Sequence, residues 1–239
     1  MTDPRSNEQG RTGTRTAAVF ADWPAPGRVL SRMFPALPGA EARRLYEGMI
    51  ADAVAAAREC AADRALLYWA EMPENEREWL RVAPAVEARR QYGPDAGARL
   101  RDAFTALLVQ PGDRAVVFCP DCPALDAAVL DRALAALAAA DVVLGPTTEG
   151  GLCLVGLSRP APELFGGFEW GAAHALEEAL ARAAAAGLGV ERLAPLEPLD
   201  TPERLVRLLA LAVAPPALPP LRTVEALREM GLLPGDRPS

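Results

Sequence analysis

Residues 115–125 decide the fold, and they read Ala-Val-Val-Phe-Cys-Pro-Asp-Cys-Pro-Ala-Leu. The first four are apolar and include β-branched side chains, which predicts a short buried strand. The Pro-Asp-Cys-Pro turn then breaks the strand, and a helical pattern follows. Asp121 is therefore expected just past the carboxyl end of a strand, where open α/β sheets gather their ligands. There it suits a hard cation such as Mg²⁺, or it caps the next helix.

The composition limits the classes of protein to which the chain can belong. The chain has 239 residues, of which 51% are hydrophobic, so it suits one large α/β domain or two small ones. Its net charge is -7, and every basic residue is Arg. The arginines are scattered among acids, whereas extended nucleic-acid binding needs a clustered basic face. We therefore expect no nucleic-acid partner.

The two ends of the chain differ from its middle. The first 16 residues are polar and lack the apolar core of a signal peptide. No apolar run reaches the roughly 18 residues of a membrane span, so we expect a cytoplasmic protein without a membrane segment. We expect a disordered leader over residues 1–15, a folded domain over 16–213, and a Pro-rich linker with a C-terminal helix over 214–239.

Periodicity and turn residues predict alternating strands and helices. A turn at Gly150-Gly151 joins two apolar runs, which predicts an antiparallel pair inside an otherwise parallel sheet. The fold class is therefore α/β, with a mixed, mostly parallel sheet flanked by helices. Strands are expected at 16–21, 64–70, 115–118, 141–146, 152–157 and 190–193; helices are expected at 41–60, 73–81, 95–109, 125–140, 172–186, from 199–203 onward and at 223–230.

The loop after the first strand is a second candidate for ligand binding. Residues 22–28 contain two prolines and Gly27, and Arg28 and Arg32 flank Ser31. Such a loop can hold a phosphate through backbone N–H groups and guanidinium contacts. It is equally compatible with a solvated turn.

Six stretches, taken in order, resemble one family pattern. Residues 119–125 are similar to G-S-D-C-P-x-L, and 198–205 are similar to D-V-D-T-P-E-D-L. Residues 91–100 are similar to Q-x-G-x-D-L-G-x-R-M. The other three stretches are 20–33, which is similar to F-x-K-x-P-x-P-G-x-V-K-T-R-L, 143–157, which contains V-L-G-P and a Gly-Gly turn, and 165–170, which is similar to L-F-x-x-I-x-W.

Together these stretches resemble a predicted glycosyltransferase family of small bacterial proteins, of the type associated with arsenosugar biosynthesis and with radical-SAM and selenodomain proteins. It belongs to the nucleotide-diphospho-sugar transferase superfamily. The resemblance implies a Rossmann-like, glycosyltransferase A-type sandwich that binds a nucleotide sugar and an acceptor over the carboxyl ends of its strands.

The resemblance also implies roles for individual residues. Gly27, Arg28 and Arg32 would hold the nucleotide phosphates, and Gln91, Gly93 and Gly97 would line the base side. Asp121 and Asp200 would bind Mg²⁺ or Mn²⁺, and Asp121 would thereby serve catalysis together with Glu149, which stands near the sugar or acceptor. Trp170 would pack on a sugar face or in the core.

The departures from the family pattern fall mainly at the positions that the resemblance assigns to phosphate and metal binding. Asp22 and Leu30 replace two lysines of the first loop, Cys119-Pro120 replaces Gly-Ser, and Pro198 replaces an Asp. Two functions are therefore expected. The first is a divergent metal-dependent glycosyltransferase, with a nucleotidyltransferase as its variant. The second is a catalytically inactive family member that acts as a binding or scaffold protein.

Other chemistries have less support. Cys119 and Cys122 form a C-x-x-C at a strand end, the place of a thioredoxin-like redox pair, but Cys60 and Cys153 are too isolated in sequence to complete a zinc site. His174 is the sole histidine, and no nucleophile elbow accompanies it. No phosphate-binding Walker loop or G-x-G-x-x-G fingerprint is present.

Overall fold

The structure is a computed structural model that describes residues 13–71, 81–84, 86–166, 169–170, 172–213 and 221–233. Three of the expected features fall outside these residues: most of the leader, residues 73–80 of the expected short helix, and the Pro-rich segment 215–220.

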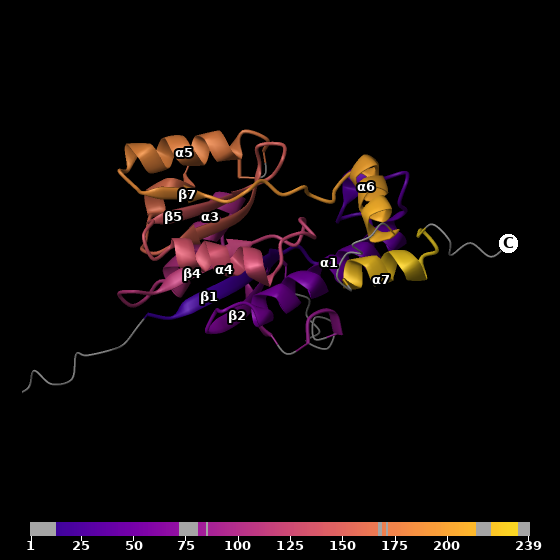
Figure 1. Ribbon diagram of the computed structural model, residues 1–239, viewed down its shortest axis with the longest axis horizontal. Helices are drawn as coiled ribbons and strands as arrows, with labels where there is room; N and C mark the ends of the chain where they lie inside the picture. Colours follow the sequence, from indigo (N-terminus) through magenta and orange to yellow (C-terminus); the bar gives the residue numbers. More distant parts are fainter. Residues whose placement is uncertain are drawn as a thin grey trace, which may run out of the picture.

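The described residues form one sheet of seven strands in the order β3-β2-β1-β4-β6-β5-β7 (Figure 1). Strand β6 runs antiparallel to β4 and β5, and the other pairs are parallel. The expected mixed, mostly parallel sheet is thus confirmed, including the antiparallel pair across Gly150-Gly151. The strands are β1 (Arg15–Ala21), β2 (Arg64–Trp69), β3 (Glu87–Arg90), β4 (Arg114–Phe118), β5 (Val142–Pro146), β6 (Leu152–Leu157) and β7 (Val190–Arg192).

Two of the described helices start at an Asp that caps them. The Asp95 carboxylate accepts a hydrogen bond from the Ala98 N–H, and that of Asp126 accepts one from Val129. The cap of the helix after β4 is therefore Asp126, and Asp121 does not cap it. The helices are α1 (Gly39–Glu59), α3 (Ala96–Leu107), α4 (Ala127–Ala136), α5 (Ala175–Ala185), α6 (Pro202–Val213) and α7 (Arg222–Glu229), with 3₁₀ turns η1 (Ser31–Met33) and η2 (Pro162–Phe165).

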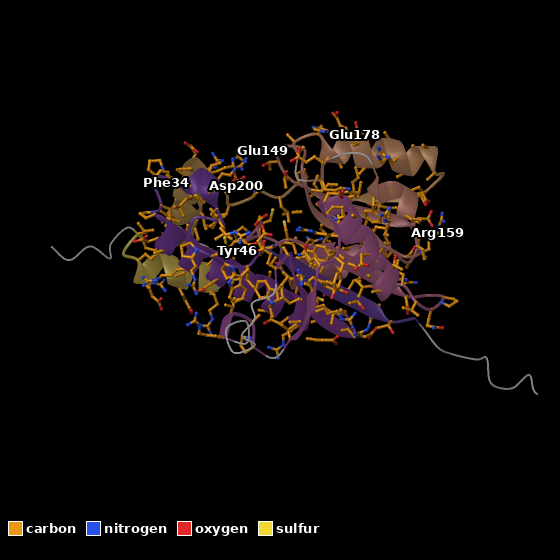
Figure 2. All side chains as sticks on the ribbon, turned by 180° about the vertical axis from the view of Figure 1, so that it is seen from behind. Phe34, Tyr46, Glu149, Arg159, Glu178 and Asp200 are labelled. Atoms are coloured by element: carbon orange, nitrogen blue, oxygen red, sulfur yellow. The ribbon has the colours of Figure 1, made fainter. Side chains whose placement is uncertain are left out.

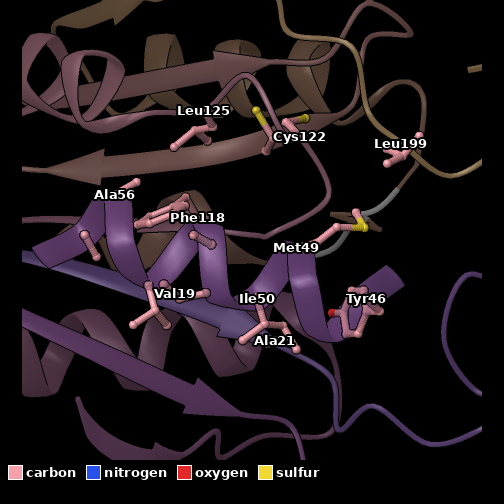
Figure 3. Packing of buried hydrophobic residues seen from close by; sticks show 14 of the residues in the cluster. Val19, Ala21, Tyr46, Met49, Ile50, Ala56, Phe118, Cys122, Leu125 and Leu199 are labelled. Carbon is pink, nitrogen blue, oxygen red and sulfur yellow. The ribbon is translucent and has the colours of Figure 1, made fainter. Parts of the chain in front are cut away.

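Helices cover both faces of the sheet (Figure 1). Successive residues of a strand point to opposite faces, so Val19 packs in one buried cluster and Ala18 in another. The first cluster joins the sheet to α1 and α4, and the second joins it to α3 and α5. Figure 3 shows the α1 side, with Ile50 and Met49 on the helix and Phe118 on β4. This is the two-faced burial that parallel sheets require.

The strand order reverses direction between β1 and β4, which are neighbours in the sheet. At such a switch point the loops that follow the two strands diverge and leave a crevice. Val19 pairs with Phe118 across the two strands, and three residues further along each chain come Asp22 and Asp121. The topology therefore brings two carboxylates to the mouth of the crevice.

The C-terminal helix α7 packs against α1 (Figure 1). The Asp52 carboxylate on α1 accepts hydrogen bonds from the backbone N–H groups of Arg222 and Thr223 and from the Thr223 hydroxyl, at 2.6–2.9 Å. At Gly48 a Cβ would lie 2.9 Å from the Arg222 carbonyl oxygen, so only glycine permits this approach. Within the described ranges, no helix combines the length and apolar character that crossing a membrane requires.

Candidate functional site

Two adjoining cavities open at the switch point, and Asp22, Tyr46 and Asp121 line both of them. The larger cavity, of about 370 Å³, has mostly apolar walls and includes Gln91 and Arg99. The smaller cavity, of about 260 Å³, is polar and includes Arg28, Arg32 and Asp200. The apolar walls come from opposite sides of the crevice: Phe20, Leu100, Leu152, Val155 and Trp170.

Asp121 lies where the two cavities meet. Its backbone carbonyl accepts a hydrogen bond from the Leu199 N–H at 2.7 Å, which brings the segment before Asp200 to the same place. Burial first, and then the charges of Asp22 and Asp200, raise the pKa of the Asp121 carboxyl to about 6, against a hydrogen bond with the Cys119 thiol that lowers it. Carboxylates that repel one another in this way favour a bound cation.

The described residues contain no group of three or more His, Cys, Asp or Glu that converges on one point to hold a metal. A complete protein cage for a metal is therefore not formed by this part of the chain. Mg²⁺ does not need one, since it is commonly held by one or two carboxylates and completed by substrate phosphates and water. The carboxylates at Asp121 and Asp22 fit that mode of binding.

Asp200 is held by two arginines. One carboxylate oxygen accepts from Arg32 at 2.6 Å, and the other accepts from Arg204, which lies four residues along on α6. The Arg204 side chain is only 7% exposed, and it also pairs with Glu149. Arg204 thus bridges the two acids that the family resemblance assigned to metal binding and catalysis, and Figure 2 shows Glu149 and Asp200 close together above Tyr46.

The two arginines expected at the phosphates line the smaller cavity, and each is paired with an acid. Arg28 makes two hydrogen bonds of 2.8 Å to Glu71, and Arg32 pairs with Asp200. Both arginine side chains are more than 60% exposed. Exposed pairs of this kind contribute little to stability, so an incoming phosphate can replace the carboxylates at small cost.

Gln91 lines the larger cavity with a fixed orientation. Its side-chain N–H groups donate to the carbonyl oxygens of Tyr68 at 3.0 Å and of Ala21 at 3.4 Å. The opposite amide orientation would set oxygen against oxygen, so the geometry fixes the assignment. Within the described residues the Gln91 side-chain oxygen accepts no hydrogen bond, and it is left available to a donor in the cavity.

The three glycines of the expected site lie beside the cavities and not in their linings. Gly27 has φ 75° in the first loop, a backbone conformation that glycine adopts without strain. At Gly97 a Cβ would lie 2.4 Å from the Phe165 carbonyl oxygen and 3.0 Å from the Trp170 ring nitrogen. Gly97 therefore lets α3 approach the Trp170 segment, and Gly93 is packed in a similar way against Ala98.

Sequence reasoning missed Tyr46, Arg99 and Arg204. Tyr46 lies one residue from Leu45 on the buried face of α1, so the pattern marks it as core, and no pattern shows where its hydroxyl points. Arg99 lines the larger cavity while its side chain donates to the Gly93 carbonyl. The signal for Arg204 was available: it stands where the family pattern has the final Asp of D-V-D-T-P-E-D-L, one helical turn after Asp200.

The cysteines are all free thiols. The side chain of Cys122 interacts with Cys153, and this contact together with burial raises the pKa of the Cys122 thiol. Burial first, and then the charge of Asp121, raises the pKa of Cys119 well above its usual value. Redox-active pairs need the opposite shift, so the geometry does not favour the redox alternative. His174 is exposed just before α5, outside both linings.

Comparison with protein families gives a match over residues 51–172, to a family described as an uncharacterised protein conserved in bacteria, DUF2064. The chain belongs to this family. The matched segment begins within α1, ends before α5 and includes β4 and Asp121. None of the curated proteins compared with the chain matches it.

Solved structures show the same fold. A candidate nucleotide-diphospho-sugar transferase from Desulfovibrio desulfuricans G20 superposes with a TM-score of 0.82 at 23% identity, over 91% of this chain and 95% of that one. A cytidylyltransferase from Leptospira borgpetersenii gives 0.52 at 11%, over 91% and 95%. A nucleotidyl transferase from Methanothermobacter gives 0.52 at 14%, over 81% and 95%. The expected Rossmann-like transferase fold is confirmed.

Proposed function

We propose that this protein binds a nucleotide sugar together with Mg²⁺ or Mn²⁺ and transfers the sugar to an acceptor. The observation that carries the proposal is the pair of cavities that share Asp22, Tyr46 and Asp121 at the switch point. The apolar cavity suits a nucleoside and the arginine-lined cavity suits its phosphates, and together they match the extended shape of a nucleoside diphosphate.

In this proposal Asp121 holds the metal together with the phosphates, and Asp200 takes part when the phosphates draw Arg32 away from it. The metal would neutralise charge on the departing diphosphate as a Lewis acid. Arg28 and Arg32 contact the phosphate oxygens, and Gln91 offers its side-chain oxygen to a donor on the base. Glu149 accepts the proton of the acceptor hydroxyl as the bond between the sugar and the diphosphate breaks.

A second candidate is a family member that binds without catalysing transfer. It is favoured by the ion pairs already present: Arg28, Arg32 and Asp200 of the smaller cavity, and Glu149, which lies in neither lining, each have a partner of opposite charge. Such a site is neutralised before any ligand arrives. A nucleotidyl transfer reaction remains a variant of the first proposal, because it uses the same nucleotide and metal.

Thermal unfolding with a panel of nucleoside diphosphates and nucleotide sugars, each with Mg²⁺ or Mn²⁺, tests the proposal. A metal-dependent rise in melting temperature is expected for one base, and Asp121→Asn should abolish the metal-dependent part. Asp102→Asn is the matched control, because Asp102 is exposed on α3 outside both linings. No rise with any ligand would exclude the nucleotide-sugar proposal, and a rise without release of the nucleoside diphosphate would favour the second candidate.

A further inference from the structure

The hydroxyl of Tyr46 is buried at the junction of the two cavities. Tyr46 projects from α1, and its side chain is 5% exposed. Together with Asp22 and Asp121 it lines both cavities, so it stands where a ligand must pass from one to the other. Figure 3 shows Tyr46 on α1, on the same side of the view as Leu199, the residue hydrogen-bonded to Asp121.

Within the described residues, this hydroxyl accepts a hydrogen bond but donates none. Its oxygen accepts a hydrogen bond of 3.2 Å from the backbone N–H of Asp22, which fixes the oxygen beside the loop after β1. Within the described ranges no group accepts the hydroxyl proton, although Asp22 and Asp121 are both close enough to affect its titration. A buried donor without an acceptor is unfavourable, so a ligand that supplies an acceptor at this point gains affinity.

The position of the Tyr46 hydroxyl indicates which group of a ligand accepts its hydrogen bond. On one side is the apolar cavity, which suits a base and ribose, and on the other is the arginine-lined cavity, which suits phosphates. The phosphate that joins the ribose to the rest of the ligand lies between them. A tyrosine hydroxyl carries its proton at neutral pH, so this group is able to donate a hydrogen bond to a ligand.

We propose that Tyr46 is a substrate-binding residue whose hydroxyl donates a hydrogen bond to a non-bridging oxygen of the ribose-linked phosphate. This inference rests on the proposed function, because it needs a nucleotide in the crevice. It makes Tyr46 a residue that distinguishes a nucleoside diphosphate from a nucleoside, in the same cavity lining as Arg28 and Arg32.

The test compares Tyr46→Phe with Tyr68→Phe by titration calorimetry. Tyr68 is an equally buried tyrosine on β2 whose hydroxyl accepts from Arg89 at 3.4 Å, and it lines neither cavity. The probes are UDP, CDP, ADP and GDP with Mg²⁺, and the four corresponding nucleosides. A hydrogen bond to a charged group supports a change in Kd of roughly tenfold to a hundredfold.

Tyr46→Phe is expected to weaken the binding of the preferred diphosphate about tenfold or more while its nucleoside binds as before, and Tyr68→Phe is expected to change neither. Unchanged diphosphate binding by Tyr46→Phe overturns the inference and leaves the proposed function standing. An equal loss for nucleoside and diphosphate also overturns it, because it indicates a collapsed loop. If the unaltered protein binds none of the eight probes, the proposed function and the inference both fail.

A second measurement needs no variant. In a nucleoside diphosphate with sulfur on the ribose-linked phosphate, one of the two diastereomers presents the weaker acceptor to Tyr46. Without divalent metal, the unaltered protein should bind the two diastereomers with affinities that differ severalfold. Equal affinities would overturn the inference even if Tyr46→Phe fails to fold.

Discussion

Arg204 connects the acidic residues of the crevice. It is nearly buried and pairs with both Asp200 and Glu149. Removing it leaves Glu149 without its cation and Asp200 with Arg32 alone, which costs more than the loss of an exposed pair. Both acids are partly open to solvent, which screens part of that cost.

We therefore expect Arg204→Met to lower the free energy of unfolding by about 1–2 kcal/mol, measured from urea unfolding curves. Arg207→Met is the control, because Arg207 lies less than one helical turn further on α6 and makes an exposed pair with Glu197. The control should unfold almost as the unaltered protein does. Equal effects of the two substitutions would show that the bridge does not stabilise the fold.

Leu30 lies in the lining of the arginine-lined cavity at a position where the family pattern has a lysine. Its backbone has φ 50°, which is unusual for a residue with a side chain and shows that the surrounding loop holds it there. Leu30→Lys should add a cation beside the phosphates and tighten nucleoside diphosphate binding severalfold at low salt.

The measurement is calorimetric titration with the diphosphate and Mg²⁺ at two salt concentrations. Val206→Lys adds the same charge on the exposed side of α6, outside the cavity, and should leave the affinity unchanged. The gain for Leu30→Lys should shrink as salt rises. A gain shared by both variants would instead reflect the general charge of the molecule.

The candidate site could be predicted as far as it depends on strand ends. Asp121, Arg28, Arg32 and Asp200 line one cavity; the strand ends pointed to Asp121 and the first loop, and the family resemblance alone pointed to Asp200. Tyr46 could not be found in this way, because a tyrosine on a helix face has the same pattern whether its hydroxyl meets a cavity or a wall. The pairing of each arginine with an acid depends on side-chain reach across the loops, which sequence spacing does not fix.

At the scale of elements, the docking of α7 depends on a cap that comes from another helix. Asp52 accepts three hydrogen bonds at the start of α7, although burial raises the pKa of its carboxyl and offsets part of the gain. Asp52→Ala should cost about 1 kcal/mol, as the loss of a helix cap does. It should also speed amide hydrogen exchange in α7 and leave α3 unaffected.

Asp102→Ala on α3 is the control for this exchange experiment, because Asp102 is exposed and caps no helix. Faster exchange in α7 should occur with Asp52→Ala and not with Asp102→Ala. Unchanged exchange in α7 would mean that apolar packing on α1, around Val224 and Leu227, is sufficient to hold the helix.

The element that sequence reasoning missed was β3. Residues 87–90 read Glu-Ala-Arg-Arg and carry no apolar alternation. They form a strand because β2 offers an unpaired edge, and charged side chains are common on such edges, where they discourage further pairing. The apolar strands were predictable to within about one residue. The helix after β4 begins later than expected, at Ala127, because Asp126 caps it beyond the Pro120 and Pro123 turn.

At the scale of the whole molecule, the crevice brings together acidic side chains from distant parts of the chain. The sheet order sets Asp22 and Asp121 side by side, and the segment before α6 adds Asp200 from a distant part of the chain. Among the described residues, Arg32 and Arg204 both pair with Asp200 and Arg28 pairs with Glu71, so no arginine pairs with Asp121. The folded protein therefore contains one buried carboxyl group, that of Asp121, which holds its proton more strongly than an ordinary carboxyl does.

This imbalance predicts how overall stability depends on pH. The Asp121 carboxyl has a pKa of about 6 in the folded protein, against an ordinary value of 3.8. Between these values the folded state holds a proton that the unfolded state has lost, so the contribution of this group to stability falls as pH rises from about 4 to 6. Above that range the full cost of the buried charge is present.

Asp121→Asn removes the charge and should therefore stabilise the ligand-free protein at pH 7.5, on the order of 1–2 kcal/mol. The advantage should decrease as pH falls through 6 and approach zero only below the ordinary pKa of 3.8, where the unaltered carboxyl is protonated in both states. Urea unfolding from pH 4 to 8 measures this, with Asp102→Asn as the control that should show no such trend. A difference that stays constant with pH would mean that the substitution acts through packing, and that the carboxylates of the crevice do not repel one another as their arrangement indicates.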